Sequence, residues 1–116
     1  MDFGAKFEEG LSYAGLLAKY GSQEHRRRWQ AVHDEVRLTD AQKELLCSFK
    51  REMKVLVSAG IWCGDCVNQC PIFDHFAAEN AKIRIHFFDR DDNSDLAEAL
   101  SICGASRVPS VLFLSE

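Results

Sequence analysis

The sequence predicts a mixed α/β fold in one domain, since 116 residues are short of the about 150 expected per domain. Residues 1–52 show the apolar spacing of helices, while residues 53–116 alternate between short apolar runs and helical periodicity. The order strand, helix, strand, helix, strand implies a parallel pair of strands joined by a right-handed crossover. We therefore expect a helical N-terminal extension at 1–52, packed on an α/β core at 53–116.

The composition is that of a globular protein, with 47% hydrophobic and 28% charged residues. The longest aliphatic or aromatic run, Val111 to Leu114, is far shorter than the about 20 apolar residues of a membrane span. The N-terminus is acidic and lacks the basic start and apolar stretch of a secretory signal. These features predict a cytoplasmic protein with no membrane partner.

Charge is distributed unevenly along the chain. Residues 61–116 hold four Lys or Arg against nine Asp or Glu, and an acidic surface repels phosphate. We therefore expect no nucleic-acid partner. The one basic cluster, Arg26 to Arg28, is interpreted as the solvated face of a helix.

Three helices are expected in the first fifty residues. The first is expected to run from Tyr13 to Tyr20. Gly21 then ends it, and Ser22 caps the second helix. Thr39 opens the third with a capping-box pattern. The faces expected to pack inward are His25, Trp29, Val32 and Val36 on the second helix, and Leu45, Leu46, Phe49 and Met53 on the third.

Three strands are expected after residue 53, around Val55 to Val57, Ile83 to Phe88 and Val111 to Leu114. Two helices connect them. Their apolar faces are predicted to be Cys66, Cys70, Phe73 and Ala77 on the first, and Leu96, Leu100 and Cys103 on the second, which Gly104 ends.

The cysteine content points to redox or metal chemistry. Five cysteines cannot all pair within one chain, and Cys63 and Cys66 are separated by two residues. Cys63 follows a predicted strand and opens a predicted helix, where unpaired backbone N–H groups favour the thiolate that attacks disulfides. Cys66, one turn further on, can then resolve the mixed disulfide. The same spacing is half of a zinc site, but a second matching pair is absent, so we expect no metal.

The motif Trp62-Cys63-Gly64-Asp65-Cys66, followed by Pro71 and by Val108-Pro109, resembles the thioredoxin family, and more closely its thioredoxin-related members. The resemblance covers residues 53–115 and implies a thioredoxin-like dithiol/disulfide oxidoreductase. It implies that Cys63 is the nucleophile, Cys66 the resolving cysteine, Pro71 a helix kink and Pro109 a cis-proline.

The resemblance also implies how the site is used. No cofactor is needed beyond the dithiol. Disulfide-containing proteins are the expected substrates, and a reductase or low-molecular-weight thiol is the expected electron donor. We expect Trp62, Val108 and Pro109 to bind substrate, and Gly64, Asp65 and Arg107 to modulate the dithiol. The Asp65 carboxylate opposes a second anion, an Arg107 side chain near the sulfur would offset this effect, and the sequence does not rank the two.

The sequence departs from the family at two places. The family's buried acidic residue before the motif is replaced by Val57, and its last strand and helix are missing. Both departures keep open a noncatalytic binding module with the same fold. The second predicts an exposed strand edge at Val111 to Leu114, and with it a homodimer or concentration-dependent self-association, or else a natural protein longer than this sequence.

The other three cysteines receive separate interpretations. Cys70 and Cys103 lie on apolar helix faces and are interpreted as small core residues, with a third redox role or a cysteine metal cluster for Cys70 as the alternatives. Cys47 lies opposite the apolar arc of its helix and is expected to face water. Lys43, Lys50 and Arg51 are expected to surround it at helical spacing.

Overall fold

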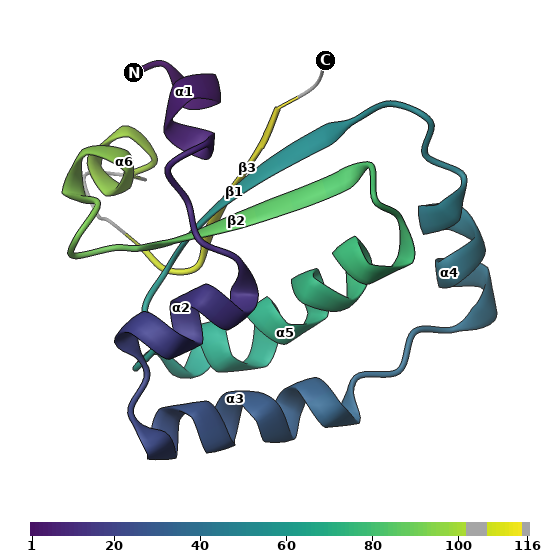
Figure 1. Cartoon of the computed structure of the whole chain (residues 1–116), viewed down its shortest axis with the longest axis horizontal. Helices are drawn as coiled ribbons and strands as arrows, with labels where there is room; N and C mark the ends of the chain where they lie inside the picture. The colour runs from purple at the N-terminus through teal and green to yellow at the C-terminus, as the bar shows by residue number, and fades with distance from the viewer. Residues whose placement is uncertain (102–106, 115–116) are drawn as a thin grey trace.

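The structure is a computed structural model that describes residues 1–101 and 107–114. In this part of the chain, six helices surround one three-stranded sheet (Figure 1). No described helix combines the length and apolar character needed to cross a membrane. The helices are α1 (Phe3–Phe7), α2 (Tyr13–Tyr20), α3 (Gln23–Glu35), α4 (Asp40–Cys47), α5 (Gly64–Glu79) and α6 (Ser94–Ala99), and the strands are β1 (Met53–Ala59), β2 (Ile83–Asp89) and β3 (Ser110–Leu114).

Strand β1 is the centre of the sheet, whose order is β2-β1-β3. It pairs in parallel with β2, and α5 forms the crossover between them, as the sequence predicts. It pairs antiparallel with β3, so that Ser58 lies opposite Ser110. Leu11 adds an isolated antiparallel bridge to Phe87 on β2. The predicted order of strands and helices is confirmed.

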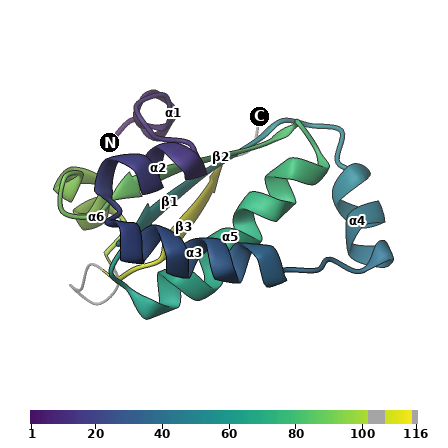
Figure 2. The same ribbon diagram turned by 60° about the horizontal axis from the view of Figure 1, so that its bottom comes forward.

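Each face of the sheet has its own core, because side chains alternate across a strand. Val55, Val57 and Ala59 of β1 pack under α2, α3 and α5, whereas Leu56 packs with residues of α1 and α6 on the other face. Figure 2 shows the sheet between these two groups of helices. The first core contains Tyr13, Leu16, Leu17, Trp29, Ile61, Cys66, Cys70 and Phe87, and the second contains Phe7, Phe88 and Leu96.

The N-terminal helices begin where the sequence predicts. Ser22 and Thr39 cap α3 and α4, and each cap is a complete capping box. The arginine cluster lies on the exposed face of α3, where Arg27 and Arg28 pair with Glu24. An additional short helix, α1, precedes these helices, and its first turn is capped by the carboxylate of Asp2.

Helix α4 is shorter than predicted. It ends at Cys47, so Phe49 lies beyond it and Met53 already belongs to β1. The physical reason is the side-chain amide of Asn80, which donates to the carbonyls of Leu46 and Phe49 at 2.8 and 2.9 Å. Lys50 and Arg51 therefore do not surround Cys47 at helical spacing, and Leu45, expected to pack inward, is 60% exposed.

Two other predicted boundaries change. Strand β1 extends beyond the predicted Val55 to Val57 run at both ends, because pairing with β2 continues from Met53 to Ala59. Helix α6 ends at Ala99, and Leu100 is its C-terminal cap. The predictions for Cys103 and Gly104 lie outside the described residues.

Replacing Trp29 tests the packing of the N-terminal segment. Its indole is 1% exposed and its Nε1 donates to the Ile61 carbonyl at 2.9 Å. Trp29→Ala should lower the free energy of unfolding by about 3–5 kcal/mol, and Trp29→Phe by about 1–3 kcal/mol, because it leaves a buried carbonyl unpaired. Urea unfolding measures both. Arg26→Ala, an exposed change on the same helix, should stay within about 0.5 kcal/mol of the parent.

Candidate functional site

The predicted motif lies where the chain leaves β1 and enters α5. A tight turn joins the two elements, in which the Cys63 N–H donates to the Gly60 carbonyl at 3.0 Å. Cys63 is the N-terminal cap residue of α5, as the sequence predicts. Its side chain makes no capping hydrogen bond to the helix. Instead, its Sγ donates to the Val108 carbonyl, with the two atoms 3.8 Å apart.

The two cysteines of the motif differ in exposure. Cys63 is half-buried, whereas Cys66 is completely buried one helical turn further on. The Cys66 Sγ accepts a hydrogen bond from the Gly60 N–H at 3.5 Å. The arrangement therefore presents one thiol toward solvent with a shielded thiol behind it.

Cys70 adds a third sulfur to this group. It lies one turn after Cys66 on the buried face of α5, and its burial, predicted from the helical pattern, is confirmed. The hydrogen bond from Cys70 lowers the pKa of the Cys66 thiol to about 7, against the opposing effect of burial. The same hydrogen bond, together with burial, raises the pKa of the Cys70 thiol, which therefore stays protonated at neutral pH.

An aromatic surface adjoins the motif. Trp62 is 50% exposed, and the Arg90 guanidinium lies over its ring, 4.8 Å from the centroid. The indole also packs against Gly60, where an added Cβ would lie 2.6 Å from the ring. Gly60 is therefore required for this ring position, and an aromatic face is available beside Cys63.

The second segment of the predicted site lies against Cys63. The Val108-Pro109 peptide bond is cis, as the resemblance to the thioredoxin family implies, and both residues are half-buried. Their position follows from the pairing of β3 with β1, which places Ser110 opposite Ser58 near the motif end of the sheet. Pro71 lies inside α5 as predicted, where it supplies no N–H to the helix.

The three predicted modulating residues are exposed. A Cβ added to Gly64 would meet no atom within 4 Å, so its lack of a side chain is not sterically required there. The Arg107 carbonyl accepts a hydrogen bond from Ser110 Oγ at 2.6 Å. The Asp65 carboxylate acts on Cys66, whose pKa it raises.

Sequence analysis missed the support that α3 gives to the site. Trp29 is predicted on the inward face of its helix, but its bond to the Ile61 carbonyl holds the loop directly before the motif. Two further contacts join α3 to α5. His33 Nε2 lies 2.9 Å from the Asp74 carboxylate, and His75 Nε2 lies 2.8 Å from the His33 carbonyl. Histidine spacing alone gives no signal for these pairs.

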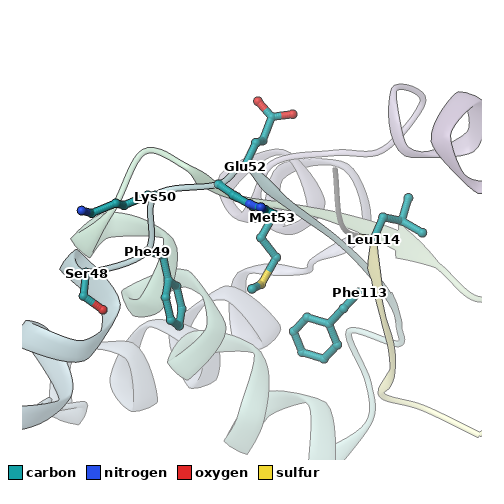
Figure 3. A pocket seen from close by; sticks show the side chains of 8 residues that line it. Ser48, Phe49, Lys50, Glu52, Met53, Phe113 and Leu114 are labelled. Atoms are coloured by element: carbon teal, nitrogen blue, oxygen red, sulfur yellow. The ribbon is translucent and has the colours of Figure 1, made fainter.

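A hollow of about 540 Å³ lies at the opposite end of β1 from Cys63 (Figure 3). Phe49, Met53 and Phe113 point into it, and Phe113, on edge strand β3, is 64% exposed. The hollow is therefore separate from the motif.

A family model described as Thioredoxin matches residues 11–116. The chain belongs to the thioredoxin family. The match begins well before the predicted boundary at residue 53, so it includes the helices α2, α3 and α4. No curated protein matches the chain.

Two solved structures share the thioredoxin-like fold of this family member. A protein of unknown function from Pseudomonas aeruginosa has a TM-score of 0.88 and 21% identity, over 100% of this chain and 71% of the other. An HIV epitope scaffold has a TM-score of 0.86 and 21% identity, over 100% of this chain and 72% of the other. At this identity the likeness establishes the fold, and the predicted fold class is confirmed.

Because the cysteine thiols are buried to different extents, they should react with a thiol-labelling reagent at different rates. In the reduced protein, Cys63 should react with iodoacetamide much faster than Cys66, because Cys66 is completely buried. After oxidation of this pair, Cys47 should react fast and Cys70 slowly, since Cys47 is exposed, as predicted, and its Sγ only donates to the Glu79 carbonyl at 3.3 Å.

Mass spectrometry of peptides measures each site separately. A Cys103→Ser background removes the cysteine outside the described residues from the comparison. Equal rates at Cys63 and Cys66 would contradict the assigned difference, and protection of Cys47 in the oxidised protein would contradict its exposed position.

Proposed function

We propose that this protein is a thiol-disulfide oxidoreductase that uses the Cys63/Cys66 dithiol. The observation that carries the proposal is a half-buried thiol at the start of a helix, with a completely buried thiol one turn further on. Membership of the thioredoxin family supports it. The cis Val108-Pro109 bond beside Cys63 supplies a backbone carbonyl at the same place.

The reaction needs two exchanges. The Cys63 thiolate attacks a substrate disulfide, one substrate sulfur leaves as a thiolate, and a mixed disulfide forms between Cys63 and the other. The Cys66 thiolate then attacks the Cys63 sulfur, so that the Cys63–Cys66 bond forms and the second substrate sulfur leaves. The substrate gains two electrons and the dithiol loses two. A reductase or a low-molecular-weight thiol restores the dithiol, and no other cofactor is required.

Substrate contact is proposed for Trp62, Val108 and Pro109. The exposed indole offers a flat apolar surface to a polypeptide, and the half-buried Val108-Pro109 segment lies beside the attacking sulfur. Gly64, Asp65 and Arg107 are proposed to modulate the dithiol from the exposed rim. Disulfide-containing proteins are the proposed substrates, and neither nucleic acid nor membrane is part of the proposal.

The proposed location is the cytoplasm. An odd number of cysteines excludes a fully paired framework within one chain, and a CxxC pair in a reducing compartment acts in catalysis or metal binding. Metal analysis of protein purified without chelator tests the metal alternative. A stoichiometric metal would contradict the oxidoreductase proposal.

A noncatalytic binding module is the second candidate, and Val57 favours it. This side chain is completely buried in the core that contains Cys66, where a carboxylate could otherwise assist deprotonation of the thiol. Turnover separates the two candidates, because a binding module with the same fold would retain its cysteines without cycling them.

Insulin reduction by dithiothreitol is the decisive assay. The parent protein should accelerate it, Cys63→Ser should return the rate to that of dithiothreitol alone, and Cys66→Ser should accumulate a mixed disulfide through Cys63, because the attacking sulfur remains while its resolver is removed. Cys47→Ser, an exposed change on α4, is the matched control and should keep the parent rate. No acceleration and no trapped adduct would favour the binding module.

Self-association through edge strand β3 stays a prediction. This strand pairs with β1 along one edge, and no described strand pairs with the other, where Phe113 is exposed. An uncovered apolar edge favours association. Sedimentation velocity should show a mass that rises with concentration, and Phe113→Lys should reduce the rise. A monomer at every concentration would contradict the prediction.

A further inference from the structure

The aromatic surface beside Cys63 depends on a residue to which the sequence pattern assigns no role. Trp62 directly precedes the proposed nucleophile, and its indole is half-exposed. The Arg90 guanidinium lies over this ring, 4.8 Å from its centroid. Trp62 belongs to the loop between β1 and α5, whereas Arg90 follows the end of β2. The indole therefore has a charged partner that comes from a different part of the sheet.

The backbone holds Arg90 in a fixed place. Its N–H donates to the Ala59 carbonyl at 2.9 Å, which extends the hydrogen bonding between β2 and β1 by one residue. The carboxylate of Asp89 accepts hydrogen bonds from the backbone N–H groups of Asp91 and Asp92, at 3.1 and 3.0 Å. Both sides of Arg90 are thus held by hydrogen bonds, at the end of the sheet where the motif lies.

The guanidinium of Arg90 is held over the ring as well. Its Nε donates to the Asp91 carboxylate at 3.3 Å, and the Arg90 side chain is 30% exposed. A partly desolvated cation is attracted to the face of an indole more strongly than a cation in water. The planar guanidinium also stacks on an aromatic ring, which an ammonium group cannot do. Arg90 therefore has both the charge and the shape to hold Trp62.

Gly60 restricts where the indole can lie. A Cβ added to this residue would be 2.6 Å from Cε2 of the Trp62 ring, so the ring occupies the place of a missing side chain. The Gly60 carbonyl accepts from the Cys63 N–H at 3.0 Å, and its N–H donates to Cys66 Sγ at 3.5 Å. The indole is therefore seated on the same backbone turn that contacts both cysteines of the motif.

We infer that Arg90 is a positioning residue for polypeptide substrates: its guanidinium holds the Trp62 indole beside Cys63, where the ring contacts the chain that carries the disulfide. This inference rests on the proposed function. Arg90 acts through Trp62 and takes no part in either exchange, so it changes how tightly a polypeptide binds and leaves the reactivity of the sulfur unchanged. A small neutral disulfide has no chain to lie on the indole and is therefore insensitive to Arg90.

Acrylamide quenching of fluorescence tests the hold on the indole without any substrate. Trp29 is 1% exposed and is shielded from this neutral quencher, so the quenched emission comes from Trp62. Arg90→Met keeps a long side chain but removes the charged planar group, and it should raise the quenching constant about twofold as the ring is released. Arg90→Lys keeps the charge alone and should give an intermediate value.

Arg84→Met is the matched control. Arg84 lies at the opposite end of β2, and its guanidinium is 5.2 Å from the centroid of the Phe7 ring, so the change removes a contact of the same kind far from the motif. It should leave the quenching constant at the parent value. Thermal unfolding shows that each variant is folded.

Steady-state reduction of insulin tests whether the held ring serves the substrate. Arg90→Met should raise the KM for insulin about two- to fivefold, the change in an equilibrium constant that a cation–π contact supports, and should leave kcat near the parent value. The rate with bis(2-hydroxyethyl) disulfide, a small neutral substrate, should not change. Arg84→Met should match the parent protein with both disulfides.

A double-mutant cycle shows whether Arg90 acts through Trp62. Trp62→Ala should itself raise the KM for insulin, and adding Arg90→Met should cause no further rise, because the ring that Arg90 holds is gone. Additive effects would overturn the proposal. Unchanged quenching in Arg90→Met, an unchanged KM for insulin, or an equal loss with the small disulfide would also overturn it. A parent protein that reduces neither disulfide would contradict the proposed function, and this inference with it.

Discussion

Burial of strand β1 on both faces is the constraint on which the other elements depend. Val55 and Val57 face the core under α2, α3 and α5, while Leu56 faces the core under α1 and α6. A strand covered on both sides has no access to water, so its backbone N–H and C=O groups must pair with neighbouring strands. β2 and β3 provide this pairing along its two edges.

This pairing also assembles the two halves of the site. The motif begins after the short Gly60-Ile61 turn that follows β1, and the register of β3 places Ser110 opposite Ser58, one residue before the end of β1. The cis Val108-Pro109 bond therefore reaches the turn that holds Cys63, although more than forty residues separate them in the sequence. The contact between Cys63 Sγ and the Val108 carbonyl is the direct result.

The N-terminal helices fix this turn from the other side. Trp29 on α3 binds the Ile61 carbonyl, and the paired side chains of His33 and Asp74 hold α3 against α5. Because the family match starts at residue 11, these contacts between α3 and the site lie inside the matched region. The different exposures of Cys63 and Cys66 depend on them, since the same helices cover the buried side of α5.

Sequence alone determined the alternation of strands and helices, the starts of α3, α4 and α5, and the position of Cys63 as a helix cap. These are local properties, set by side-chain periodicity and by capping residues within a few positions of one another. The odd number of cysteines and the two-residue spacing of Cys63 and Cys66 likewise directed attention to redox or metal chemistry without a structure.

Only the tertiary structure decided three features: where α4 ends, that Trp29 binds the loop before the motif, and that Cys66 is buried. Asn80 ends α4 from a distance of more than thirty residues, and Trp29 reaches Ile61 across a similar separation. Helical spacing placed Cys66 and Cys70 on one face, but their complete burial depends on α2, α3 and β1 together. Such contacts follow from packing between distant segments, which local periodicity does not encode.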